Sequence, residues 1–197
     1  MIQEKVIFVI PGFRQSIKSK AYIQLAKVLR SEGYTPKLVS ISWKNSTITQ
    51  NTEYFLKKYK SVKHTHKYIL GFSYGAMIAF LAATKVSSKG IVLCSLSPYF
   101  RDDVSNVHTS AVSTLTTQRY ADFLSLKSEV LAKKIKTKNV LMLYGTQEAR
   151  SLILRVKNTF EELPSKNKHL ISIKKTDHNI GDKKYLHSIQ MASKNLL

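Results

Sequence analysis

Residues 67–83 read KYILGFSYGAMIAFLAA, and the order of residue types in this stretch decides the expected fold. A short apolar run at 68–70 leads into the pentapeptide Gly71-Phe72-Ser73-Tyr74-Gly75, and a run of good helix formers follows at 76–83. This order predicts a strand that turns abruptly into a helix. Glycine is expected at both ends of the turn, because side chains there would collide with the neighbouring strand and helix.

The position of Ser73 at this turn favours a particular chemistry. A Gly-x-Ser-x-Gly sequence between a strand and a helix is a nucleophile elbow, in which strained backbone lifts the serine hydroxyl off the edge of the sheet. The following helix points its N-terminus at the same spot, where its dipole and free N–H groups stabilise an oxyanion. The alternative is a tight turn that carries an incidental serine.

Short apolar runs alternate with helical patterns along the rest of the chain. The expected strands are rich in Val, Ile and Leu, which is typical of a parallel sheet covered on both faces. They span 6–10, 37–41, 68–71, 90–95, 140–144 and 169–173. The expected helices span 19–30, 52–59, 76–84, 120–135, 151–162 and 183–194. This succession predicts the α/β class, with about six mostly parallel strands flanked by helices on both faces.

Length and composition favour one intracellular domain. The chain has 197 residues, enough for a single domain with a substantial core, and we expect one domain over 1–197. Residues 100–118 break the rhythm of strands and helices, so we expect a small lid or an irregular connection there. No apolar run has the length of a membrane span, and the run at 6–10 is too short for a signal peptide. The chain is therefore expected to be cytoplasmic.

The charge balance is strongly basic. Lysine and arginine number 32 against 12 acidic residues, which gives a formal net charge of +20 at pH 7. Lysines are scattered along the chain, with pairs at Lys57-Lys58, Lys133-Lys134, Lys174-Lys175 and Lys183-Lys184. One interpretation is a weak attraction to anionic surfaces, and the other is a lysine-rich solvated surface. No basic tail or zinc-finger spacing indicates a specific nucleic-acid partner.

A serine hydroxyl becomes a strong nucleophile when a histidine takes its proton, and the chain offers six histidines for that role. In an open parallel sheet the site lies beyond the carboxyl ends of the strands. His178 lies on a loop at such an end, directly after the last expected strand. The others precede a strand, lie in the insertion or lie inside the last helix: His64, His66, His169, His108 and His187. We therefore expect His178 to be the base, against the alternative of a solvated loop histidine.

The acid that orients this histidine is expected at the carboxyl end of another strand. Glu148 follows the strand at 140–144, and serine, acid and histidine then occur in one of the known orders of serine triads. A carboxylate at the start of the next helix is the alternative role for Glu148. Asp177 is a weaker choice, because neighbours in an extended loop point apart. The remaining alternatives come from the insertion and the helix after it: Asp122 and the pair Asp102-Asp103.

Stabilisation of an oxyanion needs two backbone N–H groups that face the developing charge. Tyr74, the residue after the nucleophile, is expected to supply one of them. Phe13, in the loop after the first strand, is expected to supply the other, because Gly12 allows a close approach. Gly12 and Arg14 are weak candidates for contact with substrate. Two serines near the carboxyl end of a strand are interpreted as loop or wall residues: Ser95 and Ser97.

Taken together, these motifs resemble those of the α/β-hydrolase superfamily. The resemblance rests on Pro11-Gly12-Phe13, the pentapeptide at 71–75, Gly145-Thr146-Gln147-Glu148 and His178, and it covers almost the whole chain. It implies a six-stranded parallel core, as in the small, nearly cap-less serine hydrolases. Two positions depart from the family pattern, since Pro11 replaces the usual His before Gly12 and Glu148 replaces the usual Asp.

The resemblance also implies an activity. It implies a serine hydrolase that cleaves small carboxylic esters or thioesters through an acyl-enzyme on Ser73, with His178 and Glu148 completing the triad. It implies no metal and no organic cofactor. A lysophospholipase, an acyltransferase or a peptidase would use the same machinery, and a non-catalytic binding protein would keep only the scaffold.

Overall fold

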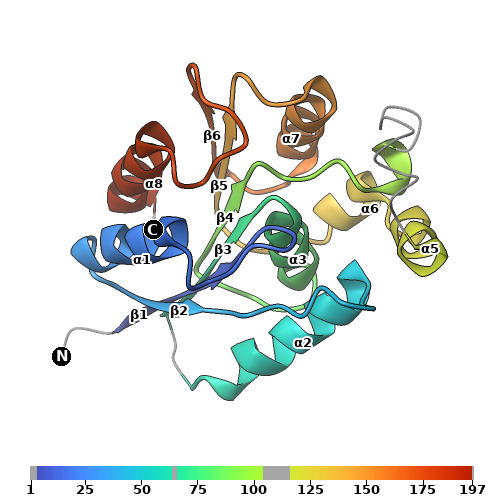
Figure 1. The fold of residues 1–197 in the computed structure, drawn as a ribbon, viewed down its shortest axis with the longest axis horizontal. Helices are drawn as coiled ribbons and strands as arrows, with labels where there is room; N and C mark the ends of the chain where they lie inside the picture. Colours follow the sequence, from blue (N-terminus) through green and yellow to red (C-terminus); the bar gives the residue numbers. More distant parts are fainter. Residues whose placement is uncertain (1–3, 64–65, 104–115, 197) are drawn as a thin grey trace.

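The computed structural model describes residues 4–63, 66–103 and 116–196. Six strands form one sheet in the order β2-β1-β3-β4-β5-β6, and every neighbouring pair is parallel (Figure 1). The strands are β1 (Lys5–Ile10), β2 (Tyr34–Leu38), β3 (His66–Phe72), β4 (Gly90–Cys94), β5 (Asn139–Gly145) and β6 (Asn167–Ile173). The predicted α/β class is confirmed, and all six carboxyl ends lie along one edge of the sheet.

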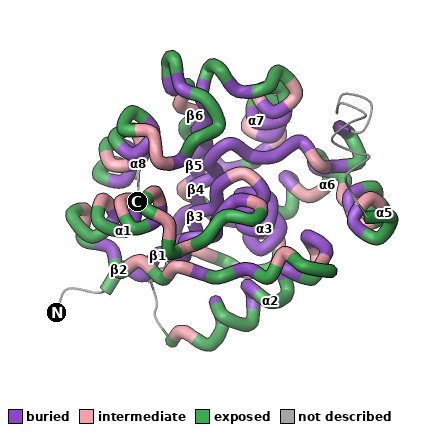
Figure 2. The backbone as a smooth tube through the Cα atoms, viewed as in Figure 1, coloured by how far each residue is buried: buried purple, intermediate pink, exposed green. Residues whose placement is uncertain are grey.

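Helices cover both faces of the sheet (Figures 1 and 2). They are α1 (Lys20–Ser31), α2 (Ile48–Ser61), α3 (Tyr74–Ala83), α5 (Thr117–Ser125), α6 (Ser128–Ala132), α7 (Arg150–Glu162) and α8 (Lys183–Leu196), with a 3-10 turn η1 at Arg101–Asp103. Helices α1 and α8 share one hydrophobic cluster with the strands, whereas α2, α3 and α7 share the other. Every residue of α3 is buried, as expected of a helix that is apolar all round.

The predicted position of the second strand is wrong by three residues. The expected range was 37–41, whereas β2 runs from Tyr34 to Leu38. This strand forms an edge of the sheet and buries only part of its side chains, so its sequence, YTPKL, lacks the continuous apolar run of an interior strand. Pro36 is tolerated because an edge strand pairs on one side only.

The single helix expected at 120–135 is also wrong, because α5 and α6 replace it. Two local contacts separate them. The Leu126 N–H donates to the Phe123 carbonyl and ends α5, whereas Oδ2 of Asp102 accepts from the Ser128 N–H at 2.7 Å and begins α6. The break therefore depends on a carboxylate from 26 residues earlier in the chain. Of the insertion predicted at 100–118, residues 104–115 lie outside the described residues.

A buried ion pair holds the start of this insertion against α7. Arg155 Nη2 lies 2.7 Å from Oδ1 of Asp103, and the two side chains are 3% and 7% exposed. The Arg155 guanidinium also lies over the Phe100 ring, 5.5 Å from its centroid, as in a cation–π contact. Burial raises the pKa of Asp103, although Arg155 opposes this shift. The pair therefore holds η1 against α7.

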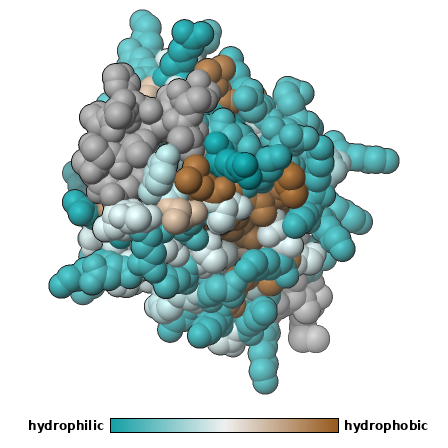
Figure 3. Space-filling view, turned by 90° about the vertical axis from the view of Figure 1, so that its right-hand side faces the viewer, coloured by the Kyte–Doolittle hydropathy of each residue, from teal (hydrophilic) through white to brown (hydrophobic). Residues whose placement is uncertain are grey.

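One face of the molecule carries an apolar patch. Figure 3 shows apolar side chains gathered near the middle of the face on which α5 lies. Two large hydrophobic side chains of α5 and α6, Leu124 and Val130, are exposed. Within the part of the chain that the structure describes, no helix has the length and apolar character needed to cross a membrane.

Candidate active site

The site begins at the turn between β3 and α3. Ser73 lies between the last residue of the strand and the first residue of the helix, with φ 58° and ψ −118°. Few residues other than glycine adopt this backbone conformation, and it is costly for serine. The Ser73 N–H donates to the Cys94 carbonyl at 2.8 Å, which ties the turn to the neighbouring strand β4. The predicted strand-to-helix turn is thus present, with Ser73 in strained geometry.

The two glycines of the pentapeptide are required by close backbone approaches. A Cβ added to Gly71 would lie 2.2 Å from the Gly75 carbonyl oxygen. A Cβ added to Gly75 would lie 2.3 Å from the carbonyl oxygen of Ile10, at the end of β1. Both neighbours are backbone atoms, so no side-chain rotation relieves either contact. The glycines therefore let α3 pack tightly against β1 and β3.

Replacing Gly75 with alanine is expected to lower the free energy of unfolding by about 3 kcal/mol or more, because backbone of β1 would have to move. The measurement is equilibrium unfolding in urea. Gly33→Ala is the matched control, since a Cβ there meets nothing within 4 Å and only the positive φ of 82° opposes it. The Gly33→Ala control is expected to lower the free energy of unfolding by about 1–2 kcal/mol. Equal losses in the two variants would contradict the packing argument.

His178 reaches the turn from the loop after β6. Its Nε2 lies 2.8 Å from the Ser73 hydroxyl oxygen. Its ring packs on Phe72 with a centroid distance of 4.8 Å, and 41% of the side chain remains exposed. The loop is held near β5, because the Gln147 N–H donates to the Thr176 carbonyl at 3.0 Å. The structure thus brings together the predicted base and the predicted nucleophile.

Glu148 follows β5 and faces the other side of the same histidine. Its Oε1 lies 3.4 Å from Nδ1 of His178, and its side chain is fully buried. Catalytic contacts in unliganded sites are commonly long and tighten when substrate binds. The alternative role at a helix start is not seen, because Ala149 is the N-cap residue of α7 and Glu148 makes no cap hydrogen bond. The His178 ring therefore lies between the Glu148 carboxylate and the Ser73 hydroxyl, with one ring nitrogen near each.

The other candidate acids are placed elsewhere. Asp122 Oδ2 accepts from the Thr49 N–H at the start of α2, at 3.1 Å. Asp102 accepts a hydrogen bond from the Ser128 N–H at the start of α6, and Asp103 forms an ion pair with Arg155. Asp177 precedes His178 in the chain and its side chain is exposed to solvent. Among the described carboxylates, Glu148 is the one recorded in contact with the His178 ring.

A buried hydroxyl pair that the sequence did not indicate supports Glu148. Ser95 Oγ donates to Glu148 Oε1 at 2.5 Å and lies 2.7 Å from the Tyr185 hydroxyl of α8. The Tyr185 hydroxyl is also 3.3 Å from the Leu143 carbonyl. Burial raises the pKa of Tyr185 well above its usual value, so the phenol stays protonated. Ser95 therefore holds Oε1 of Glu148, the same carboxylate oxygen that faces His178.

Ser95 therefore does more than the expected loop or wall residue, because it bonds to Glu148, whereas Ser97 is a wall residue of the site. Ser95 has a φ of 52°, and this sharp turn directs its hydroxyl at Glu148. Ser97 is buried, and its hydroxyl lies 3.1 Å from the Ser73 hydroxyl. Both follow β4 at its carboxyl end. Their position beside two predicted loops of the site was the signal available in the sequence.

The loop after β1 carries one of the two N–H groups predicted to stabilise an oxyanion. The Gly12 N–H donates to the Tyr22 hydroxyl at 2.9 Å and so is already engaged. Within the described ranges, the N–H groups of Phe13 and Tyr74 have no recorded acceptor. Arg14 has a φ of 57° and its guanidinium lies over the Phe13 ring, 5.0 Å from the centroid. The predicted donors are thus unengaged, and the Arg14 side chain packs against Phe13.

An aromatic wall surrounds the ring of Tyr74, the residue that follows Ser73 in the chain. The Tyr74 ring is at the centre, and four rings surround it with centroids 5.4–5.9 Å away: Phe13, Trp43, Tyr99 and Phe123. The Tyr74 hydroxyl and the Trp43 indole N–H are buried without a hydrogen-bond partner in the described part of the chain. Burial raises the pKa of Tyr74, which keeps its hydroxyl protonated. The wall is therefore apolar, with two unused polar atoms.

Cys94 and possible metal ligands complete the inventory of reactive groups. Cys94, the only cysteine of the chain, is fully buried at the end of β4, and burial raises the pKa of its thiol. A thiol in such surroundings is unreactive. Across 4–63, 66–103 and 116–196, no three His, Cys, Asp or Glu side chains form a group able to hold a metal ion.

Comparison with known proteins establishes the fold. Est1E from Butyrivibrio proteoclasticus, solved with ferulic acid bound, superposes with a TM-score of 0.80 and 14% identity over 98% of this chain and 87% of its own. Mouse alpha/beta hydrolase domain-containing protein 10 superposes with a TM-score of 0.76 and 14% identity over 95% and 87%. A Paleococcus ferrophilus monoacylglycerol lipase superposes with a TM-score of 0.74 and 15% identity over 98% and 96%.

Comparison at the level of sequence gives a different result. No protein-family model matches the chain, and no curated protein matches it. The structural likeness extends over nearly the whole chain, so the chain has the α/β-hydrolase fold. At these identities the likeness shows the fold alone, and an activity has to be argued from the site itself.

Proposed function

We propose that this chain is a serine hydrolase that cleaves small carboxylic esters or thioesters. Ser73 is the nucleophile, His178 the general base and Glu148 the acid that orients the base. The observation that carries the proposal is the 2.8 Å contact between the Ser73 hydroxyl and His178 Nε2 at a strained strand-to-helix turn. A nucleophile within hydrogen-bond reach of an oriented base is the arrangement that acyl transfer needs.

In the proposed acylation step, His178 takes the Ser73 proton while Oγ attacks the acyl carbonyl carbon. The oxyanion that forms is stabilised by the N–H groups of Phe13 and Tyr74. Glu148 stabilises the positive charge on the His178 ring through Nδ1. His178 then donates its proton to the departing alcohol or thiol, and an acyl ester of Ser73 remains.

In the proposed deacylation step, water takes the place of the leaving group. His178 removes a proton from the water, which attacks the acyl carbon and forms a second oxyanion at the same N–H groups. Collapse of this intermediate releases the carboxylic acid and returns the proton to Ser73. The sequence of steps consumes one water per ester and needs neither metal nor organic cofactor.

The structural neighbours support an ester substrate, since they include a monoacylglycerol lipase and a Pyrococcus furiosus esterase. The aromatic wall around Tyr74 supports an apolar acyl group beside the nucleophile. Acyl transfer to an acceptor other than water would follow the same first step. We treat hydrolysis as the reaction, because the exposed edge of His178 leaves room for water.

Labelling with a fluorophosphonate probe tests the proposal. We expect the purified protein to be labelled on one residue, and both Ser73→Ala and His178→Ala to abolish labelling. The probe reacts only with a serine that a base has activated. Cys94→Ala is the control and should keep full labelling, since the thiol is fully buried and the substitution keeps the backbone carbonyl that accepts from the Ser73 N–H. A folded wild-type protein that does not react would indicate a non-catalytic protein on this scaffold.

A further inference from the structure

Two of the four lysine pairs noted in the sequence meet in the fold. Lys174-Lys175 follows β6, and Lys183-Lys184 begins α8, which packs beside that strand (Figure 1). Together with His187 they line an open hollow of about 560 Å³, completed by Ser172, Ile173 and Ser188. We call this surface the basic hollow. The loop that carries His178 joins its two sides.

The positive charge of the basic hollow is not neutralised. All four lysines and His187 are exposed, and no ion pair is recorded for any of them among the described residues. The connecting loop holds two acids, Asp177 and Asp182, but neither lines the hollow. Asp182 Oδ1 instead accepts from the Lys184 backbone N–H at 2.7 Å. The surface therefore attracts anions.

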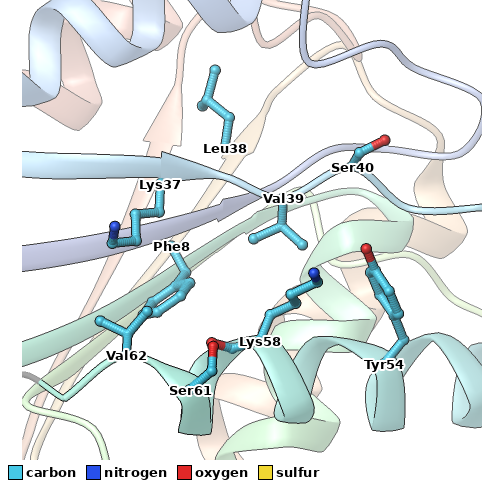
Figure 4. A pocket seen from close by; sticks show the side chains of 9 residues that line it. All are labelled: Phe8, Lys37, Leu38, Val39, Ser40, Tyr54, Lys58, Ser61 and Val62. Carbon is cyan, nitrogen blue, oxygen red and sulfur yellow. The ribbon is translucent and has the colours of Figure 1, made fainter.

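The other two lysine pairs have different surroundings. Lys133 forms an ion pair with Glu129 at 2.6 Å on α6. Lys58 lies over the Tyr54 ring, 5.6 Å from its centroid, in a separate hollow of about 280 Å³ between the end of β2 and α2 (Figure 4). The pKa of Glu53 on the same helix is lowered, mainly by the hydrogen bond from Lys85 and to a smaller extent by the charges of Lys60 and Lys57. Among the four lysines of these two pairs, Lys133 is the one with an ion pair recorded in the described part of the chain.

We propose that the basic hollow binds the surface of an anionic phospholipid membrane. The hollow contains no arginine and no buried charged side chain, so it lacks the rigid fork that holds a single phosphate or carboxylate. Exposed ammonium groups on flexible stems instead suit a layer of phosphate groups. Charge complementarity between four lysines and anionic head groups is the attraction.

An exposed apolar side chain beside the basic hollow favours a membrane over a soluble polyanion. Met191 lies one turn of α8 beyond His187 and is 47% exposed. A basic surface with an exposed apolar side chain at its border is typical of proteins that lie on a membrane interface. The binding does not depend on the proposed hydrolysis, and Ser73 takes no part in it.

Co-sedimentation with vesicles tests the proposal. The vesicles are phosphatidylcholine alone or phosphatidylcholine mixed with phosphatidylglycerol, at low and high salt. One variant carries Lys174→Gln, Lys175→Gln, Lys183→Gln and Lys184→Gln. The matched control carries Lys57→Gln, Lys58→Gln, Lys133→Gln and Lys134→Gln, so both variants lose four charges. Thermal unfolding verifies that both are folded.

We expect the wild-type protein to bind the mixed vesicles at low salt and to be released at high salt. The basic-hollow variant should lose on the order of 100-fold in affinity, whereas the control should lose less than about threefold. Ser73→Ala should bind as the wild type does, which separates this proposal from the catalytic one. Equal losses in the two quadruple variants would overturn it, as would absence of binding to anionic vesicles. Competition by inorganic phosphate at equal phosphate concentration would show a soluble anion site instead, and would also overturn it.

Discussion

Replacing Ser73 with alanine is expected to lower kcat/KM for an activated short-chain ester by about 10⁴-fold or more while leaving the fold intact. The substitution removes the only atom that would form the acyl-enzyme. It leaves the Ser73 backbone and both glycines of the turn in place. The measurement is steady-state hydrolysis of a p-nitrophenyl ester, with thermal unfolding to verify the fold.

Ser97→Ala is the matched control for this prediction. It deletes the same hydroxyl group at a position 3.1 Å from the Ser73 hydroxyl, and it removes a hydrogen bond without removing the nucleophile. We expect a loss of about tenfold or less. A Ser73→Ala variant that retains its activity, or a Ser97→Ala variant that loses as much as Ser73→Ala, would show that Ser73 is not the nucleophile.

Replacing Glu148 with glutamine is expected to lower kcat by about 10³-fold. The amide keeps the size of the side chain but removes the negative charge that stabilises the protonated His178 ring. Because Glu148 is buried, no solvent anion replaces it. The measurement is hydrolysis of the same ester across a range of pH.

Asp177→Asn and Asp122→Asn are the controls for the acid, because each removes one carboxylate charge in the same manner. Both are expected to change kcat less than twofold, since Asp122 is bonded to α2 and Asp177 is exposed. The loss of kcat in Ser95→Ala should be larger than in these controls and smaller than in Glu148→Gln, because Glu148 would keep its charge but lose the 2.5 Å hydrogen bond from Ser95. A silent Glu148→Gln beside a large loss in either aspartate variant would identify a different acid.

Most of the fold could be predicted from local patterns. The interior strands are short apolar runs because helices cover them on both faces, and each such run was placed to within a few residues. The prediction was wrong where the sequence signal depends on position in the sheet. Strand β2 is half-buried at an edge, and the division between α5 and α6 depends on Asp102, far away in the chain.

The site was predictable to the extent that it follows from topology. His178 and Glu148 were chosen because loops after parallel strands meet at one edge, and the structure places both beside Ser73. Their roles stay predictions until they are tested. Tyr185 had no such signal, since it lies inside α8, and its contact with Ser95 joins residues 90 positions apart. The packing of α8 against the sheet decides that Tyr185 reaches Ser95.

The amino-acid sequence by itself determined the sheet, the turn at Ser73 and the edge at which the site assembles, because strand, turn and helix propensities act over a few residues. The tertiary structure decided which groups surround those residues. The hydrogen bond from Ser95 to Glu148 and the one between Ser97 and Ser73 depend on the register between β4 and its neighbours. The meeting of two lysine pairs likewise depends on how α8 packs beside β6, since distances across the sheet are set by packing and not by separation along the chain.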